Sequence, residues 1–363
     1  MKTAALAPDS LSPPRETVSA KTRIVDDMAI IRAAAELTRD LNAPNPWIYW
    51  ADFLGFTILG YAGLFLALGA AQPLAVAGWV TVSIIGLYRA GLFIHELTHI
   101  KHSAVPGFRL AWNVLIGVPL LVPSFMYEGI HNLHHARTRY GTVEDPEYLP
   151  LALMKPWTVP LFVLVAALGP IALFVRFAVL TPLSVVIPPL RTLVVERFSG
   201  LIINPVFRRR PPEGAARRDW LLLETACSVW AIALLSAVAG GVIPLRDFLM
   251  FLGVLSGVVV LNQIRTLVAH LWENDGDVMS VTAQFLDSVN VPPPGVLPAL
   301  WAPVGLRYHA LHHLLPGLPY HALGEAHRRL SAALVPESTY HRASYDGLPG
   351  LVIRLMGNTA KGA

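Results

Sequence analysis

Four long apolar stretches dominate the pattern of hydrophobic and polar positions along the chain. Residues 47–70 and 74–95 are separated by a short uncharged link, and residues 219–241 and 246–269 are separated by another. Each stretch is long enough for an α-helix to cross the hydrocarbon core of a bilayer, which takes about 20 residues. The pattern therefore predicts two transmembrane helical hairpins.

A further apolar region, residues 156–203, is interrupted by several prolines. The histidine-rich segment 131–135 precedes this region and the arginine-rich loop 208–218 follows it, and the basic residues around both favour the cytoplasmic side. The region must then cross the membrane an even number of times, either as two short spans or not at all. We expect a re-entrant or interfacial hairpin that does not cross, because the prolines interrupt a spanning helix.

Three shorter segments complete the predicted architecture. Residues 1–25 are polar and predict a cytoplasmic tail, whereas residues 28–42 have apolar and charged positions at helical spacing, which predicts a helix on the membrane surface. Residues 103–130 are apolar but contain three prolines, which favours a surface or partly sunken segment. We therefore expect an all-α integral membrane protein with about four transmembrane helices in two hairpins, re-entrant or interfacial helices, and a cytoplasmic histidine-rich cap.

The expected division of the chain follows the same pattern. Residues 1–46 would form the cytoplasmic N-terminal tail and interfacial helix, residues 47–335 the membrane domain, and residues 336–363 a cytoplasmic C-terminal tail. Basic residues indicate the orientation, because they collect after the second apolar stretch and are absent from the link that precedes it. Both termini and the histidine clusters are then cytoplasmic, and we expect the inner membrane of a bacterium.

Composition agrees with a membrane protein and narrows its chemistry. Hydrophobic residues make up 54% of the 363 residues and charged residues only 14%, and the mean hydropathy is +0.52. The net charge of +4 is small, which favours contact with a membrane surface and not with nucleic acid. The single cysteine, Cys227, excludes an internal disulfide and a CxxC metal or redox motif.

Histidine clusters provide the candidate chemistry. The sequence HELTH covers residues 95–99, and the pattern HxxHH occurs at residues 131–135 and again at residues 309–313. With 13 histidines in the chain, HxxHH is expected by chance roughly 0.02 times. Residues four apart share one face of a helix, so we expect each cluster to present its imidazoles to one side. Imidazole suits iron, zinc and copper, and the clusters therefore predict metal binding.

The number of imidazoles indicates two metal ions, because one ion takes four to six ligands at most. A dinuclear centre with nitrogen ligands at the mouth of an apolar bundle suits oxidation of an unactivated C–H bond by iron, whereas zinc has no redox chemistry. His270 ends the last apolar stretch and is a further candidate ligand. For His102, metal ligation and an ordinary polar role are equally compatible with the sequence. Three other histidines are expected to be ordinary polar residues or to line a substrate entrance: His321, His327 and His341. No role is assigned to the intramembrane Arg89 and Arg265.

Groups that orient the imidazoles are expected among polar residues close to the clusters in sequence. The candidates are Glu96, Glu128, Asp145, Glu273, Asn274 and Asp275.

The three histidine clusters, the spans between them and the segment HHLLPGLPYHAL resemble the membrane fatty acid desaturase superfamily, which includes related hydroxylases. The resemblance covers roughly residues 45–330. It implies a transmembrane stem with a cytoplasmic cap and a centre of two iron ions. It implies nine metal ligands: His95, His99, His131, His134, His135, His270, His309, His312 and His313.

The resemblance also implies a reaction, in which O2 and two electrons remove two hydrogens from a fatty acyl chain of a membrane lipid. The HPGG motif of a fused cytochrome b5 domain is absent from the sequence, so an external ferredoxin-like or cytochrome b5-like electron donor is expected. No catalytic residue is predicted beyond the metal ligands, and nucleic acid is not expected as a partner. Acyl desaturation is the main prediction.

Three alternatives stay open. Lipid hydroxylation begins with abstraction of hydrogen from the same kind of C–H bond, and the sequence does not separate it from desaturation. HELTH also fits HExxH, in which two histidines bind zinc and Glu96 would activate water in a membrane protease. That reading leaves both HxxHH clusters unused. A non-enzymatic haem-binding anchor or metal carrier would need only paired histidines that face each other within the spans.

Overall fold

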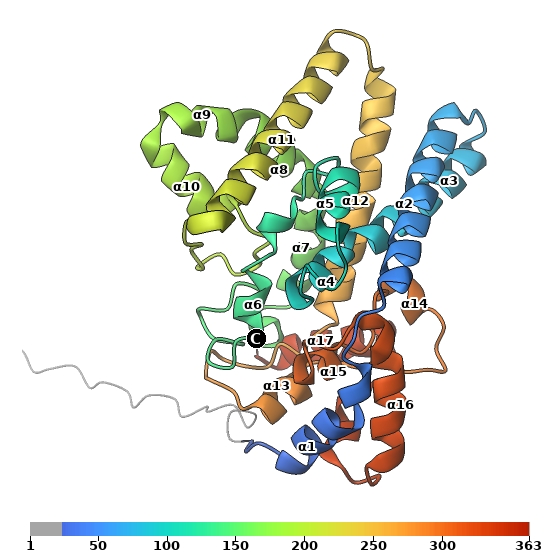
Figure 1. Cartoon of the computed structure of the whole chain (residues 1–363), viewed down its shortest axis with the longest axis vertical. Coiled ribbons are helices and arrows are strands. Elements are labelled where there is room, and N and C mark those ends of the chain that lie inside the picture. Colours follow the sequence, from blue (N-terminus) through green and yellow to red (C-terminus); the bar gives the residue numbers. More distant parts are fainter. Residues whose placement is uncertain (1–23, 363) are drawn as a thin grey trace, which may run out of the picture.

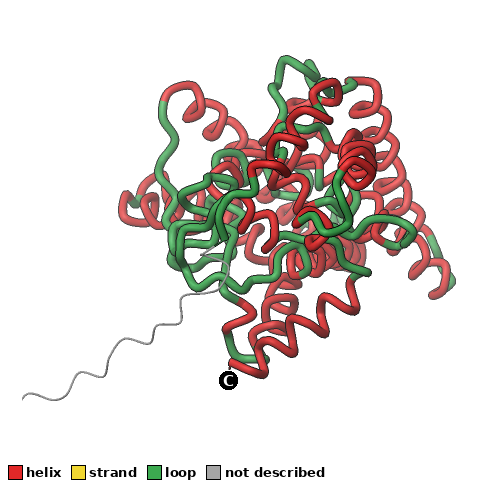
Figure 2. Tube along the Cα trace, turned by 90° about the horizontal axis from the view of Figure 1, so that it is seen from below, coloured by secondary structure: helices red, strands yellow, loops and turns green. Residues whose placement is uncertain are grey.

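The computed structural model describes residues 24–362, so nearly all of the cytoplasmic tail predicted over residues 1–25 lies outside the described residues. Within residues 24–362, regular structure consists of helices, with isolated β-bridges only. Figure 2 views the molecule from the cap end and shows helices joined by loops. The predicted all-α fold is confirmed.

Both predicted hairpins are present. The first consists of α2 (Pro46–Gly69) and α3 (Pro73–Gly91), and the second of α11 (Gly214–Ala239) and α12 (Leu245–Leu267). The turns of both hairpins point away from the cap (Figure 1). Each of the four helices is long and apolar enough to cross a membrane, so the chain is an integral membrane protein.

Small residues bring α2 and α3 close together. A Cβ atom at Gly60 would lie 2.7 Å from the backbone nitrogen of Leu87, and one at Gly86 would lie 2.6 Å from the Cα of Gly60. Two helices can approach this closely only where no side chain intervenes. After a single intervening residue, Leu92, the chain continues into α4 (Phe93–His99), which carries the first histidine cluster toward the cap.

Residues 156–203 form a hairpin with unequal arms. Its first arm is a continuous helical run, Thr158–Val186, and its second is α10 (Pro188–Phe198), which begins after Ile187 turns the chain back. The first arm consists of α7 (Thr158–Leu164), η5 (Val165–Leu168), α8 (Gly169–Phe174), η6 (Val175–Leu180) and α9 (Thr181–Val186). The prolines change the pitch of this run through short 3-10 and π turns without ending it.

The first arm is a fifth helix long and apolar enough to cross a membrane. Both flanks of the hairpin nevertheless lie at the cap. Before it, Ala152 N donates to Trp272 O at 3.2 Å, and after it, Ile203 N donates to Pro146 O at 3.0 Å. The chain therefore enters and leaves this hairpin on the cap side, as the charge pattern requires. That the hairpin stays short of a full crossing remains a prediction.

A buried ion pair fixes this hairpin to the second transmembrane pair. The guanidinium of Arg176 donates to the carboxylate of Glu224 at 2.5 Å, and Arg191 donates to the same carboxylate at 2.8 Å. Charges at this depth are costly unless they are paired. The pairing therefore defines how the hairpin packs against α11.

Residues 103–130 contain no uninterrupted span, as predicted. They form α5 (Phe108–Trp112), η2 (Asn113–Gly117) and η3 (Ser124–Met126), and lead into α6 (His131–His134), which carries the second histidine cluster. Trp112 donates from Nε1 to the carbonyl of Ala90 at 2.9 Å, which fixes this segment against α3.

The cap contains the remaining helices. They are α1 (Met28–Leu37), η1 (Arg39–Leu41), η4 (Leu151–Leu153), α13 (Val281–Asp287), α14 (Pro298–Trp301), α15 (His309–Leu314), η7 (Tyr320–Ala322), α16 (Leu323–Ala333), η8 (Thr339–Ala343) and α17 (Leu348–Gly362). The third histidine cluster lies on α15. Residues 336–362, expected as a C-terminal tail, include η8 and α17, and α17 packs against η4.

The helix predicted over residues 28–42 is present as α1, followed by the short turn η1. Its fully buried residues, Ile30 and Ala34, pack with Leu330 of α16. The apolar face therefore packs on the protein and not on the membrane surface, because α16 offers a complementary apolar face.

Candidate metal centre

Nine histidines converge in the cap, from α4, α6 and the residue after it, the segment that follows α12, and α15. Five of them form one group, and four form another. Each histidine contributes one ring nitrogen, and within a group all of these nitrogens lie within 4.8 Å of one another. We call these sets the five-histidine group (His95, His99, His131, His135 and His312) and the four-histidine group (His134, His270, His309 and His313).

Each HxxHH cluster is divided between the two groups, which corrects the expectation that its three imidazoles point to one side. His131 and His135 belong to the five-histidine group, whereas His134 belongs to the four-histidine group. The third cluster divides in the opposite sense, since His309 and His313 stay together and His312 joins the other group. The reason is helical geometry: at about 100° per residue, positions four apart differ by only about 40°, whereas the middle histidine points to the other side of the pair.

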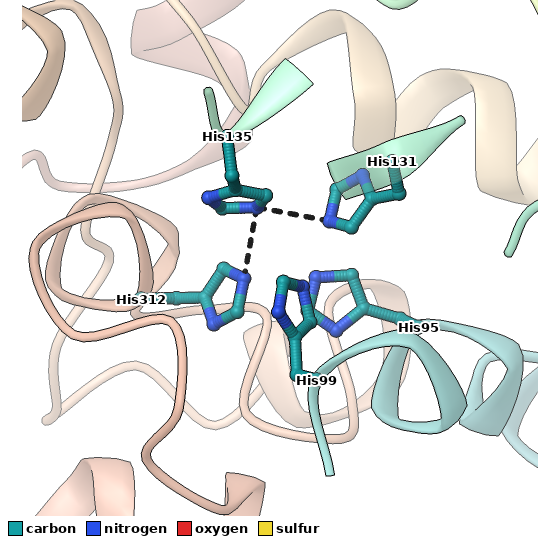
Figure 3. A group of neighbouring side chains, drawn as sticks. All are labelled: His95, His99, His131, His135 and His312. Atoms are coloured by element: carbon teal, nitrogen blue, oxygen red, sulfur yellow. Dashed lines mark hydrogen bonds between the residues drawn. The ribbon is translucent and has the colours of Figure 1, made fainter. Parts of the chain in front are cut away.

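The ring nitrogens face one another at short range. In the five-histidine group, His135 Nε2 lies 3.0 Å from His131 Nε2 and 3.2 Å from His312 Nε2 (Figure 3). In the four-histidine group, His309 Nε2 lies 3.1 Å from His270 Nε2 and 3.2 Å from His313 Nε2. One nitrogen shared by two others cannot satisfy both with a single proton, so these contacts are poor hydrogen bonds.

Two nitrogens that face into the five-histidine group have no partner at all. Among the described residues, neither His95 Nε2 nor His99 Nε2 makes a hydrogen bond, although both atoms are buried. Leaving buried polar atoms unsatisfied is costly. A metal ion among the nitrogens would use every lone pair, so the donor set fits metal ions.

The protonation of the rings agrees with this fit. Burial, reinforced by the charges of neighbouring imidazoles, lowers the pKa of His135, His312 and His313 well below the ordinary histidine value. Rings with a lowered pKa are neutral at pH 7, and the neutral imidazole is the form that binds metal.

Carboxylates and hydroxyls hold the opposite ring nitrogens. Glu147 lies 3.0 Å from His131 Nδ1, and Asp145 lies 2.9 Å from His134 Nδ1. Burial alone would lower the pKa of His134, but the Asp145 carboxylate outweighs it and the pKa is raised. Burial raises the pKa of Glu147 to about 7. Such partners fix which nitrogen faces a metal.

His270 is held through a chain of hydroxyls. Its Nδ1 lies 2.8 Å from the hydroxyl of Tyr140 and 3.2 Å from that of Ser288. The buried Asp287 accepts hydrogen bonds from the hydroxyls of Tyr140 at 3.0 Å and of Tyr148 at 2.9 Å. The segment that follows α12 is thereby tied to the loop that follows the second histidine cluster.

Of the six orienting residues expected from sequence, two lie beside a clustered imidazole. Asp145 contacts His134, and a carboxylate oxygen of Glu96 lies 3.5 Å from His95 Nδ1. The others bind elsewhere or face solvent. Glu128 pairs with Arg109, Glu273 with Arg354, Asn274 donates to the carbonyl of Gly141, and Asp275 is exposed.

Sequence reasoning missed Glu147 and the network of Tyr140, Tyr148 and Asp287. Glu147 had a local signal, because it stands two residues after Asp145 in the acidic loop. Asp287 had none, because it reaches His270 through Tyr140, whose contact with His270 spans 130 positions of the chain.

The remaining histidines lie outside both groups. His102 is half exposed and lies 3.5 Å from Glu128, so it is separate from the nine. His321 accepts a hydrogen bond from the backbone of Asn45, and His327 bonds to the hydroxyl of Tyr340.

A cavity of about 420 Å³ leads from within the membrane helices to the five-histidine group. His95 is the one clustered histidine that lines it, and its walls are mostly apolar, as in Trp112, Leu173 and Val259. This volume lies in the range of small-molecule sites. An apolar chain could therefore reach the histidines from the bilayer side.

The sequence profile of the family described as fatty acid desaturase matches residues 71–345, well over half of the chain. The chain belongs to the fatty acid desaturase family. The resemblance inferred from the histidine clusters is thus confirmed, and membership identifies the chain as an oxidoreductase that acts on lipids in a membrane with O2.

A ceramide hydroxylase from Caulobacter vibrioides (strain NA1000 / CB15N) is 49% identical over 326 residues, which cover 90% of this chain and 93% of the relative. No solved structure matches the chain. Membership of this family does not support the HExxH protease reading. The hydrogen bonds of Glu96 do not support it either, because its carboxylate accepts one from the hydroxyl of Tyr49 at 2.5 Å and another from the backbone of Tyr320 at 3.1 Å.

Proposed function

We propose that this protein is a membrane-bound, O2-dependent diiron hydroxylase that adds a hydroxyl group to a hydrocarbon carbon of a ceramide-like lipid. The similarity to a ceramide hydroxylase over nearly the whole length of both chains carries this proposal. It favours the alternative of the sequence analysis over acyl desaturation, which becomes the second candidate because the family is named for it.

The two reactions use the same reagents in different ways. Hydroxylation breaks one C–H bond and consumes O2, two electrons and two protons, with one oxygen atom entering the lipid and the other leaving as water. Desaturation consumes the same reagents, removes two hydrogens from adjacent carbons and leaves both oxygen atoms as water. Either reaction needs an external reductant, for which we propose a ferredoxin-like or cytochrome b5-like protein.

The five-histidine group and the four-histidine group would each hold one iron ion. When bound, iron supplies the O2 activation and redox chemistry that amino-acid side chains lack, and zinc could not replace it in this role. The nine histidines offer neutral nitrogen donors, and Asp145 and Glu147 hold two of the rings by their far nitrogens. The apolar cavity binds the lipid chain and excludes water from the reacting carbon.

The orientation of the protein is part of the proposal. Basic residues flank the histidine clusters, and the positive-inside rule favours the cytoplasm for the cap and for both termini. An electron donor would then reach the centre from the cytoplasm, whereas the lipid would enter from the bilayer.

The test combines metal analysis of the purified protein with lipid analysis. We expect two irons per chain and, after reaction with O2, a reductant and a ceramide, a product heavier by one oxygen atom that comes from O2. A product lighter by two hydrogens would replace hydroxylation by desaturation and keep the centre. A protein that binds no iron even after reconstitution would overturn the proposal.

A further inference from the structure

The cavity that reaches His95 also contains an unusual polar group. Arg265 lies in the last turn of α12 and lines the cavity together with Asn262, one turn earlier. α3 and α12 pack side by side, and both run toward the cap. Arg265 and His95 therefore lie at the same end of the cavity, beside the five-histidine group.

Arg265 is buried and does not reach the membrane surface. Its exposed fraction is 9%, and its Nε makes no hydrogen bond among the described residues. Its Nη2 donates to Asn262 Oδ1 at 3.2 Å. The long side chain thus keeps its charge inside the protein, at the cavity wall.

Three other arginines beside the membrane helices show what Arg265 lacks. Arg89 pairs with Asp52 at 2.6 Å, Arg109 with Glu128 at 2.7 Å and Arg176 with Glu224 at 2.5 Å. Among the described residues, no carboxylate lies within ion-pair distance of Arg265; the Tyr88 hydroxyl lies beside its guanidinium, and the Glu147 carboxylate acts on it only from a longer distance. A buried charge that lacks a close carboxylate and keeps one donor unsatisfied is costly, so the free Nε–H of Arg265 calls for an oxygen from outside the chain.

The donors that remain define the kind of oxygen. Arg265 offers its Nε–H, and because Asn262 accepts from Arg265 through its oxygen, the amide NH2 of Asn262 remains as a second donor. Two donors at the end of an apolar cavity fit a carbonyl oxygen attached to a hydrocarbon chain. An amide carbonyl of an N-acyl lipid and the carboxylate of a free fatty acid both present one.

We propose that Arg265, assisted by Asn262, binds the carbonyl oxygen at the head of the substrate's acyl chain and so sets which carbon is oxidised. The inference rests on the proposed function and adds the recognition element to it. Since Arg265 and His95 line the same end of the cavity, the oxidised carbon lies close to the carbonyl group and not in the middle of the chain.

The test compares two lipids on two forms of the protein. The first lipid is a ceramide, and the second is the same molecule with its amide carbonyl oxygen replaced by sulfur, which is a weaker hydrogen-bond acceptor and leaves the lipid uncharged. We expect the wild-type enzyme to prefer the ceramide by about 10- to 100-fold in kcat/KM, the range that a hydrogen bond to a charged group supplies. In Arg265→Met this preference should vanish, with the ceramide falling to the level of the analogue.

Two further measurements separate recognition from damage to the fold. Iron per chain should be unchanged in Arg265→Met, because Arg265 holds no imidazole, and equilibrium binding of labelled ceramide should weaken by a similar factor. Mass spectrometry should show oxygen at one carbon for the wild type and spread over several carbons for the variant. Asn262→Leu should show the same changes with a smaller amplitude, and provides the test if Arg265→Met does not fold.

Two exposed arginines, Arg246 and Arg197, serve as controls for the buried Arg265. Arg246 lies exposed near the opposite end of α12, so Arg246→Met should retain the full preference. Arg197 also lines the cavity but is exposed on α10. Loss of the preference in Arg197→Met, with retention in Arg265→Met, would overturn the proposal and move the carbonyl to the far end of the cavity.

The outcomes distinguish this inference from the proposed function. If wild-type enzyme hydroxylates ceramide and Arg265→Met keeps the wild-type preference, only the assignment of Arg265 is wrong. If wild-type enzyme oxidises a free fatty acid and not ceramide, and Arg265→Met abolishes that reaction, the carbonyl site stands and its source is a carboxylate. If wild-type enzyme oxidises neither lipid, the proposed function itself fails.

Discussion

The five-histidine group and the four-histidine group differ in what surrounds them. The five-histidine group takes two members from α4, at the end of a membrane helix, and one of them, His95, lines the cavity. The four-histidine group is buried throughout and has no member on the cavity wall. The first group therefore faces the cavity, whereas the second is enclosed by the cap.

The polar support of the two groups differs as well. In the four-histidine group, Asp145 and the Tyr140 hydroxyl hold two of the four rings. In the five-histidine group, Glu147 holds one of the five rings, His131. Among the described residues, both groups also contain rings whose Nδ1 makes no hydrogen bond: His95 in the first, and His309 and His313 in the second. The comparison indicates that a larger share of the rings is held by polar partners in the enclosed group, two of four, than in the group beside the cavity, one of five.

Removal of a ligand should have the largest effect and should fall unequally on the two groups. We expect His134→Ala and His312→Ala to lower hydroxylation by more than about 100-fold, beyond the 10- to 100-fold that outer partners contribute. The four-histidine group has no ligand to spare, so His134→Ala should also lose one iron per chain, whereas His99→Ala should lose less. Metal analysis measures the iron content of the membrane-inserted variants, and an activity assay measures their hydroxylation rate.

His102→Ala is the matched control for these variants, because His102 lies outside both groups. It should keep its iron and its activity. Equal iron content in His134→Ala and His99→Ala would remove the distinction between the groups.

Loss of an orienting carboxylate should come next. Asp145→Asn keeps the shape of the side chain but removes the charge that holds His134, and we expect activity to fall about 10- to 100-fold. Iron affinity, measured by competition with a chelator, should fall with it. Glu144→Gln, an exposed neighbour on the same loop, should change neither quantity.

Obstruction of the cavity should affect only the substrate-facing side. Leu173→Trp places a larger side chain on the cavity wall. An overpacking cost of about 1.4 kcal/mol, which is within the usual range, corresponds to a loss of about tenfold in kcat/KM for long-chain lipids. Iron content should not change, since α8 carries none of the nine histidines. A parallel loss of iron would show that the cavity and the histidine groups are not separable.

The smallest effect should come from the hydroxyl network behind His270. Tyr140→Phe removes one hydrogen bond to His270 and one to Asp287, and a neutral hydrogen bond is worth about 0.5–1.5 kcal/mol. We expect a decrease of roughly 3- to 10-fold in iron affinity of the four-histidine group. An unchanged affinity would mean that the network is not needed for rigidity.

Some features were predictable because they depend on local sequence. The spans at α2, α3, α11 and α12 follow from runs of apolar residues, and the histidine clusters follow from spacing along a helix. The even number of crossings by residues 156–203 agrees with the contacts of Ala152 and Ile203 at the cap, because charge patterns constrain topology without reference to packing.

Other features could not be predicted because neighbouring residues in sequence diverge in space. Glu128 lies three positions before His131 yet pairs with Arg109, and Glu273 lies three positions after His270 yet pairs with Arg354. Sequence alone assigned no role to Arg265. Only the packing of α12 against α3 puts it on the cavity wall.

The sequence by itself determined that this is a helical membrane protein with three histidine clusters, because hydrophobic runs and helical spacing are local properties. The family and the nine ligands were implied by the resemblance of those clusters to the fatty acid desaturase superfamily. The tertiary structure decided how each HxxHH cluster is shared between two groups and which carboxylates hold the rings. It also decided that Arg265 meets His95 at one cavity. These contacts join residues as far as 177 positions apart in the chain, and which of them meet is set by how helices pack and not by spacing along any one helix.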